Sequence, residues 1–142
     1  MFCYLCLMGK KKRKHKIDRE KIKKKFGEKC AYCGEKLTDS WNIDHIIPKS
    51  NFKKIIDEGG QPAFLKHLKS GDVNHEDNLF PSCGSCNRYK DSYTLRQFRK
   101  ELTQLTKRLN ERTTIYRIAK RFNLIKENEI KILFYFETYK KK

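Results

Sequence analysis

The sequence predicts a small α+β domain in which two short strands and a helix are held together by a metal ion. Two Cys-x-x-Cys pairs have the ligand spacing of a structural zinc site. Each pair lies close to a short apolar segment, 41–47 or 78–81, that is typical of a strand. After the second pair, leucine and phenylalanine recur at helical spacing. The two pairs are Cys30 with Cys33 and Cys83 with Cys86.

Length and composition favour one small basic domain with extensions. Of 142 residues, 37% are hydrophobic and 36% are charged, so the core is limited and a metal or disulfide staple is expected. The 34 basic and 17 acidic residues give a net charge of +17, which indicates a polyanionic partner, nucleic acid before membrane. A solvated basic surface is the alternative, but the charges cluster. No apolar run of about 18 residues is present, so we expect no membrane-spanning helix.

Residues 1–27 are predicted to form a basic arm followed by a short helix. Lys10 to Lys16 is almost unbroken positive charge, which suits an arm lying along phosphates. The pattern over 17–26 is loosely helical. Cys3 and Cys6 have no second pair to complete a metal site, so we expect free thiols, with half of another metal site as the alternative.

Residues 28–93 are predicted to be the central module. Gly34 follows the second cysteine and relieves the tight turn that lets both sulfurs face one ion. Four thiolates complete a tetrahedral zinc shell and leave no open position, so this site is structural. The spacing argues for zinc rather than disulfides, and therefore for a reducing compartment, which we expect to be the cytoplasm.

A long connection, 49–77, separates the two predicted strands. Gly59-Gly60 interrupts it, and 61–69 is predicted to be a short helix with a proline in its first turn. A connection of this length is usually functional or an insertion. His67 and His75 lie here; either could contact DNA or a metal, but a polar surface role is the expectation for each.

The C-terminal third, 94–142, is predicted to be a helical extension. A helix starts near Ser85, and one long helix follows, whose apolar stripe indicates core rather than a dimer seam because it lasts only about two heptads. Residues 130–136 alternate in part and predict a terminal strand. The stripe consists of Leu95, Phe98, Leu102, Leu105 and Leu109, and a second helical face of Ile115, Ile118, Ala119 and Phe122.

The adjacent pair Asp44-His45 is the strongest candidate for chemistry. A carboxylate can hold a hard cation, and an imidazole with a pKa of about 6.5 can take a proton from water at neutral pH. Taken alone, the pair is better explained by a turn acid at the end of a strand and a half-buried hydrogen-bonding histidine. Its position between two cysteine pairs favours the chemical interpretation.

Several pieces of 28–93 together resemble the HNH endonuclease family, which has the ββα-metal fold. They are Cys30-Ala31-Tyr32-Cys33, Asp44-His45-Ile46, Asn78-Leu79 and Cys83-Gly84-Ser85-Cys86-Asn87. The resemblance implies a metal-dependent DNA endonuclease that hydrolyses phosphodiester bonds.

The resemblance also implies a role for each matching residue. His45 would be the general base, and Asp44 and Asn87 would bind one catalytic Mg²⁺, for which Mn²⁺ can substitute. Asn78 would pin the loop and hold the His45 strand. Asn87 stands where the family often has histidine, which suits an oxygen-preferring cation. The interval from His45 to Asn78 is longer than is usual for the family, which leaves the strand pairing open.

Arg88 and Lys90, near the predicted helix start, are candidate phosphate contacts, with a solvated helix face as the alternative. A basic face on the long helix could add further contacts. The alternative function for the whole chain is a non-catalytic zinc-knuckle module that binds nucleic acid. Such a module has no need of an acid, an imidazole and an amide together. DNA is the expected partner; target specificity, nicking or double-strand cleavage, and oligomeric state are left open. The basic face comprises Arg96, Arg99, Lys100, Lys107 and Arg108.

Overall fold

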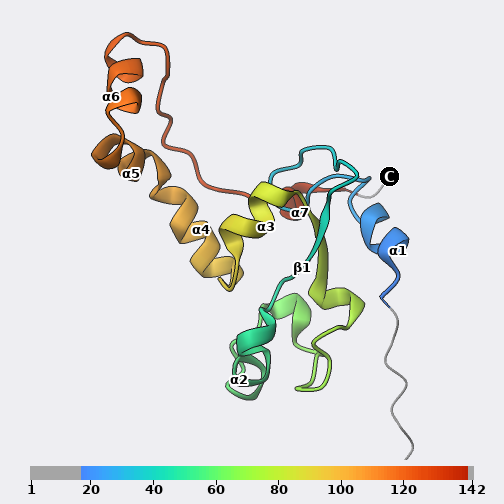
Figure 1. The fold of residues 1–142 in the computed structure, drawn as a ribbon. Helices are drawn as coiled ribbons and strands as arrows, with labels where there is room; N and C mark the ends of the chain where they lie inside the picture. Colours follow the sequence, from blue (N-terminus) through green and yellow to red (C-terminus); the bar gives the residue numbers. More distant parts are fainter. Residues whose placement is uncertain (1–16, 141–142) are drawn as a thin grey trace, which may run out of the picture.

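The computed structural model describes residues 17–140 and confirms the predicted α+β class (Figure 1). Three short 3-10 helices lie in the connection between the strands, at Lys49–Asn51, Ala63–Leu65 and Glu76–Asn78. The elements in chain order are α1 (Arg19–Lys24), β1 (Asn42–His45), α2 (Phe52–Asp57), β2 (Leu79–Ser82), α3 (Gly84–Lys90), α4 (Leu95–Thr103), α5 (Leu105–Arg112), α6 (Thr114–Arg121) and α7 (Tyr135–Thr138).

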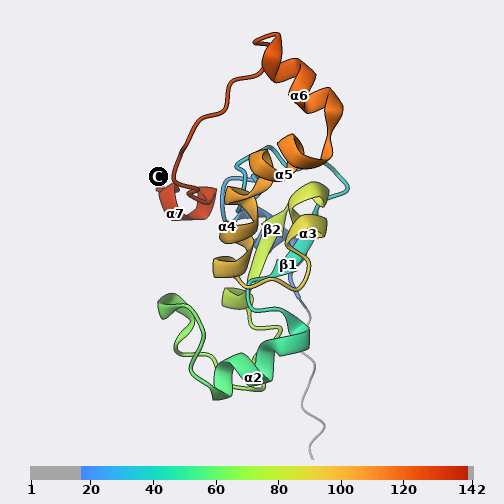
Figure 2. The ribbon, with the colours of Figure 1, turned by 90° about the vertical axis from the view of Figure 1, so that its left-hand side faces the viewer.

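The two predicted strands pair as an antiparallel hairpin despite the long connection between them. Asn42 lies opposite Ser82 and His45 lies opposite Leu79. The backbone N–H of Ile46 donates to the carbonyl of Asn78 at 2.9 Å, which continues the pairing past the end of β1. Because α3 begins directly after β2, the chain forms a β-β-α unit whose strands and helix lie side by side (Figure 2).

At its N-terminal side the unit is covered by α1, which packs against β2. Asp18 begins this helix by accepting a hydrogen bond from the backbone N–H of Lys21 at 3.1 Å, and Ile22 is buried. The predicted helix in 17–26 therefore exists but is shorter. The arm at Lys10–Lys16, together with Cys3 and Cys6, lies outside the described residues.

The core is built from aromatic side chains of distant segments. Tyr32 meets Phe98 and Phe134 edge-on, each at 5.4 Å between ring centroids. Phe98 and Phe134 stack on each other, also at 5.4 Å. Phe134 comes from the C-terminal segment, so the core includes residues from both sides of the boundary predicted at residue 93.

The terminal strand predicted for 130–136 is wrong. The segment has no strand partner among the described residues and ends in α7. The backbone N–H groups of Tyr135 and Phe136 donate to the carbonyls of Tyr32 and Ala31, each at 2.9 Å. These hydrogen bonds dock the segment on the cysteine knuckle, so its apolar residues pack there instead of in a sheet.

The single long helix predicted over 95–109 is also wrong, because it is divided at Gln104 into α4 and α5. The hydroxyl of Thr103 donates to the carbonyl of Lys100 at 2.7 Å, and such local bonds compete with continuation of a helix. Only the first part of the apolar stripe is core: Leu95 and Phe98 are buried, whereas Leu109 is exposed.

The helix predicted over 61–69 is reduced to the 3-10 turn Ala63–Leu65. Its backbone bonds span three residues, as in Leu65 N–H to the carbonyl of Pro62 at 2.9 Å. Leu65 and Leu68 are nevertheless buried, so this turn anchors the connection to the core.

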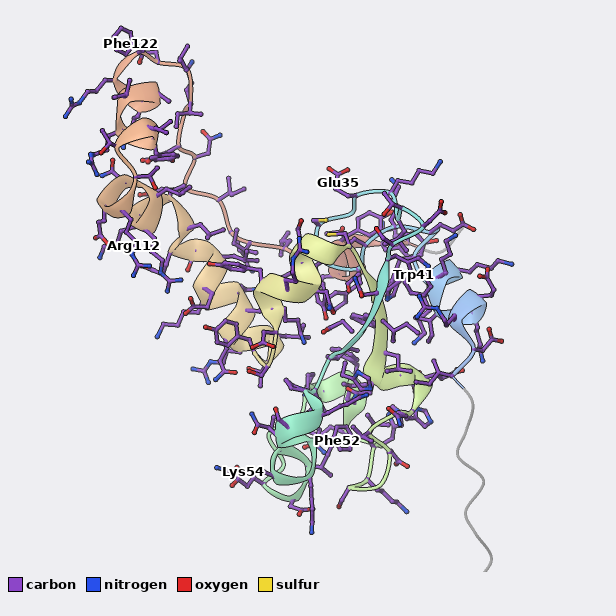
Figure 3. All side chains as sticks on the ribbon, in the orientation of Figure 1. Glu35, Trp41, Phe52, Lys54, Arg112 and Phe122 are labelled. Atoms are coloured by element: carbon purple, nitrogen blue, oxygen red, sulfur yellow. The ribbon has the colours of Figure 1, made fainter. Side chains whose placement is uncertain are left out.

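A helical arm made by α5 and α6 projects from the body of the molecule (Figure 1). The helix predicted around 115–122 is present as α6, but its apolar face is exposed. Phe122 lies at the tip of the arm and is 73% exposed (Figure 3). Within the described residues, no helix is both long enough and apolar enough to span a membrane.

Candidate active site and metal centre

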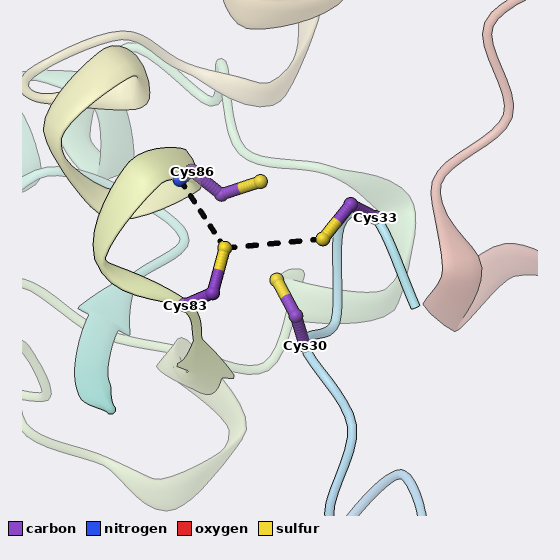
Figure 4. Close-up of side chains that lie close together, drawn as sticks. All are labelled: Cys30, Cys33, Cys83 and Cys86. Carbon is purple, nitrogen blue, oxygen red and sulfur yellow. Dashed lines mark hydrogen bonds between the residues drawn. The ribbon is translucent and has the colours of Figure 1, made fainter. Parts of the chain in front are cut away.

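The four cysteines of the two pairs converge in space (Figure 4). Cys83 begins α3 and Cys86 lies one turn later, while the knuckle with Cys30 and Cys33 is held against β2 by a hydrogen bond from the Ala31 N–H to the Pro81 carbonyl at 2.8 Å. All four sulfurs lie within 4.8 Å of one another.

The spacing of the sulfurs fits tetrahedral zinc. The sulfurs of Cys33 and Cys83 are 3.8 Å apart. A tetrahedron with Zn–S bonds of about 2.3 Å places its sulfurs about 3.8 Å from each other. The cluster therefore has both the ligand chemistry and the dimensions of a closed, structural zinc site.

The four thiols perturb one another strongly when no ion is bound. The neighbouring Cys86 thiol lowers the pKa of Cys30 to about 4, while burial raises the pKa of Cys33 to about 11. The pKa of Cys86 is raised, first by its hydrogen bond to Cys30. Four thiolates this close repel one another, and the charge of a bound dication would offset that repulsion and lower the pKa of each thiol that binds it.

Gly34 closes the knuckle for two physical reasons. Its φ of +77° lies in the region that side chains disfavour. In addition, a Cβ at this position would lie 2.9 Å from the Tyr135 ring, where the C-terminal segment docks.

Next to this centre, a shallow hollow of about 260 Å³ brings together three of the residues predicted to carry chemistry. Asp44 and His45 come from the end of β1, and Asn87 comes from α3. The remaining walls come from β1 itself, from the chain after β1 and from the chain after α3. They are Ile43, Pro48, Lys49, Ser50, Asp91 and Ser92.

Asp44 is buried and one of its oxygens is engaged. Its Oδ2 lies 2.8 Å from the ammonium of Lys90 and accepts a hydrogen bond from the Tyr32 hydroxyl. Burial raises the pKa of Asp44, and Lys90 opposes that rise. Burial likewise raises the pKa of Tyr32 well above its usual range, so the phenol stays protonated and donates.

Lys90 corrects the prediction of a phosphate contact at this position. Its side chain is 0% exposed, and its ammonium also donates to the carbonyl of His45 at 2.8 Å. Buried charges are found paired because desolvation of a lone ion is costly. Lys90 therefore ties the end of α3 to β1 and does not reach a phosphate.

His45 is half-buried at the end of β1. Its Nε2 lies 3.0 Å from Oδ1 of Asn74, and an amide oxygen only accepts hydrogen bonds, so Nε2 carries the hydrogen. Burial lowers the pKa of His45, which favours the neutral ring at pH 7. Its Nδ1 is then free to accept a proton. Sequence reasoning missed Asn74 because nothing in the motif pattern of the connection marks it.

Asn78 is fully buried, and its amide bonds two other parts of the connection. Its Oδ1 accepts from the Ile47 N–H at 2.8 Å. Its Nδ2 donates to the carbonyls of Ile47 at 3.2 Å and Val73 at 2.9 Å. These bonds tie the loop after β1 to the start of β2.

The basic residues near the site differ in availability. Arg88 is exposed on α3 and has no side-chain partner among residues 17–140. On the predicted basic face, Arg99 pairs with Glu137 at 2.6 Å, and Arg108 pairs with Glu101. These two arginines are engaged within the chain.

The fold and the site together define a ββα module with a zinc site. In this module, four cysteine sulfurs join a two-stranded hairpin to a helix, beside a hollow that contains an imidazole. The family model of HNH endonuclease matches residues 30–61, which include the first cysteine pair and Asp44-His45, and confirms the resemblance found in the sequence. The match indicates nuclease or nucleic-acid-binding activity and a nucleic-acid partner. No curated protein and no solved structure matches the chain.

Replacing Cys83 with serine tests the zinc centre. We expect Cys83→Ser to lose its tightly bound ion and its cooperative unfolding transition, because metal binding and folding are coupled in small metal-stapled domains. Metal analysis and thermal melting are the measurements. Cys3→Ser/Cys6→Ser, which keeps the four clustered cysteines, is the matched control and should melt as the native chain. Retention of the ion with a native melting curve in Cys83→Ser would refute the centre.

Replacing Lys90 with methionine tests the buried ion pair. We expect Lys90→Met to lower the free energy of unfolding by roughly 3–5 kcal/mol, because it leaves the Asp44 carboxylate buried without its cation. The double variant Lys90→Met/Asp44→Asn should recover part of that loss, since it removes the unpaired charge. Chemical denaturation measures Lys90→Met, Asp44→Asn and the double variant. Additive effects of the two substitutions would show that the pair does not contribute as described.

Proposed function

We propose that this protein is a DNA endonuclease that hydrolyses phosphodiester bonds with His45 as the general base and one Mg²⁺ held by Asp44 and Asn87. One observation carries the proposal: these three side chains line a single hollow, and Nδ1 of His45 has no hydrogen-bond partner among the described residues. The HNH match over residues 30–61 supports the same class of reaction.

His45 would activate the attacking water. Its neutral ring accepts the proton at Nδ1, and the Nε2–H bond to Asn74 keeps the ring in that tautomer and orientation. A positioned general base typically contributes a rate factor of about 10²–10⁴. Lys90 holds the backbone of His45 through its carbonyl at 2.8 Å, which fixes the position of the base on its strand.

Asp44 and Asn87 offer hard oxygen donors of the kind that Mg²⁺ prefers. The Asp44 oxygen that faces neither Lys90 nor Tyr32 has no hydrogen-bond partner among the described residues, so it is free to ligate. When bound, the ion supplies charge relief at the phosphate and stabilises the leaving oxygen. Lys90 already balances the negative charge of Asp44. The negative charge of the substrate phosphate would therefore balance the charge of the bound ion.

The net charge of +17 and the exposed Arg88 support binding to the phosphate backbone of DNA. Phosphate contacts add affinity without reading sequence. The second candidate, a non-catalytic nucleic-acid-binding module, is favoured by one observation: the Lys90 ammonium already occupies one oxygen of the proposed Mg²⁺ ligand.

A plasmid-nicking assay separates the two functions. We expect native protein to cut plasmid DNA with Mg²⁺ or Mn²⁺ and to stop when EDTA is added. His45→Ala should reduce the cutting rate by about 10²–10⁴-fold because the base is lost. DNA binding by gel shift should be unchanged in this variant. Binding without cleavage by the native protein would leave the binding module as the function. Equal cleavage by His45→Ala would refute His45 as the general base.

Asn74 is expected to act as a positioning residue for His45. Asn74→Ala should lower the cutting rate by about tenfold, in line with the loss of one hydrogen bond of ~1.4 kcal/mol. Asn74→Asp, which keeps an acceptor oxygen, should retain most of the rate, and the exposed Asn110→Ala is the matched control. Single-turnover cleavage and DNA affinity are measured together. An unchanged rate in Asn74→Ala, or an equal loss in Asn74→Asp, would contradict the role.

A further inference from the structure

A second group of metal-ligating side chains lies outside the cysteine centre, on the connection between β1 and β2. His67, His75 and Asp77 place one donor atom each within 4.8 Å of the others. Nε2 of His67 lies 2.9 Å from Oδ2 of Asp77, and Nδ1 of His75 lies 3.6 Å from the same oxygen. From the sequence, a polar surface role is the expectation for each histidine, with contact to DNA or a metal as the alternative.

The dimensions of this triangle fit a small transition-metal ion. Zinc bonds of about 2.0–2.2 Å to imidazole nitrogen and carboxylate oxygen place tetrahedral donors about 3.3–3.6 Å apart. Of the two observed separations, 3.6 Å is at the upper limit of that range and 2.9 Å is shorter than it. The three side chains are about half exposed, so an ion can reach them from solvent.

We propose that His67, His75 and Asp77 bind a second transition-metal ion, with zinc as the best fit. Two imidazoles and one carboxylate suit Zn²⁺ better than Mg²⁺, which prefers oxygen donors. Three protein ligands leave a fourth position for water. The proposal does not depend on the proposed nuclease activity, because it concerns residues that do not line the hollow with His45.

The hydrogen bonds of the metal-free cluster show how an ion would enter. Nδ1 of His75 accepts a bond from the Asp77 N–H at 3.2 Å, so an ion that binds this nitrogen takes the place of that hydrogen bond. His67 and Asp77 share one hydrogen across their 2.9 Å contact. An ion at Nε2 takes the place of that hydrogen, and the neutral His67 ring then carries its one hydrogen on Nδ1.

An ion bound at the cluster would stabilise the connection between β1 and β2, because of where the three residues lie. His67 precedes a turn in which the Lys69 N–H donates to the Asp72 side chain at 2.8 Å, and His75 follows it. The His75 N–H donates to the Asp72 carbonyl at 2.8 Å. An ion would join the two sides of this turn and so fix the segment from which Asn74 reaches His45.

Metal counting on the full chain tests the proposal. After equilibrium dialysis against zinc, native protein should hold two ions per chain, and His67→Gln, His75→Gln and Asp77→Asn should each hold one. His45→Gln, an imidazole control outside the cluster, should hold two. Cys3→Ser/Cys6→Ser should also hold two, which excludes the N-terminal thiols as the second site.

Cobalt substitution identifies the ligands of the second ion. The second equivalent should add d–d absorption without further thiolate-to-cobalt charge transfer, and it should slow hydrogen exchange over 66–78. One zinc per native chain would overturn the proposal. A second ion that survives in Asp77→Asn, or one that is lost in Cys3→Ser/Cys6→Ser, would overturn it as well.

Discussion

The constraint on which the rest of the structure depends is the meeting of four sulfurs from two segments that are far apart in the sequence. It fixes the knuckle against the start of α3, and the knuckle in turn receives the C-terminal segment through the carbonyls of Ala31 and Tyr32. Tyr32 lies between the two knuckle cysteines, and its hydroxyl donates to Asp44. The metal centre and the candidate catalytic hollow are therefore linked through one side chain.

The helix α3 is fixed at both of its ends. At its start, Cys83 and Cys86 belong to the sulfur cluster, and at its end Lys90 donates to Asp44 and to the carbonyl of His45. A buried ammonium is costly unless it is paired and hydrogen-bonded, and here both conditions hold. This double attachment places Asn87, between the two ends, in the hollow with Asp44 and His45. The positive charge of Lys90 also reduces the attraction of Asp44 for a dication. The ion pair that holds α3 in place would therefore weaken metal binding at Asp44.

The long connection between the strands is organised rather than loose. Leu65 and Leu68 anchor it in the core, and the buried amide of Asn78 closes it through three hydrogen bonds. Within it, Asn74 gives His45 a defined tautomer. A segment that departs from the usual spacing of the family therefore supplies the partner of the proposed base, and its histidines supply the proposed second ion.

The sequence by itself determined the cysteine centre, the pairing segments and the pair Asp44-His45, because ligand spacing and short apolar segments are local signals. It also indicated a nucleic-acid partner through net charge. Only the tertiary structure decided that Lys90 is a buried partner of Asp44 rather than a phosphate contact, and that Asn74 contacts His45. It alone divided the long helix at Gln104 and docked 130–136 on the knuckle. The physical reason is that burial and long-range hydrogen bonds depend on residues distant in sequence, which no local pattern specifies.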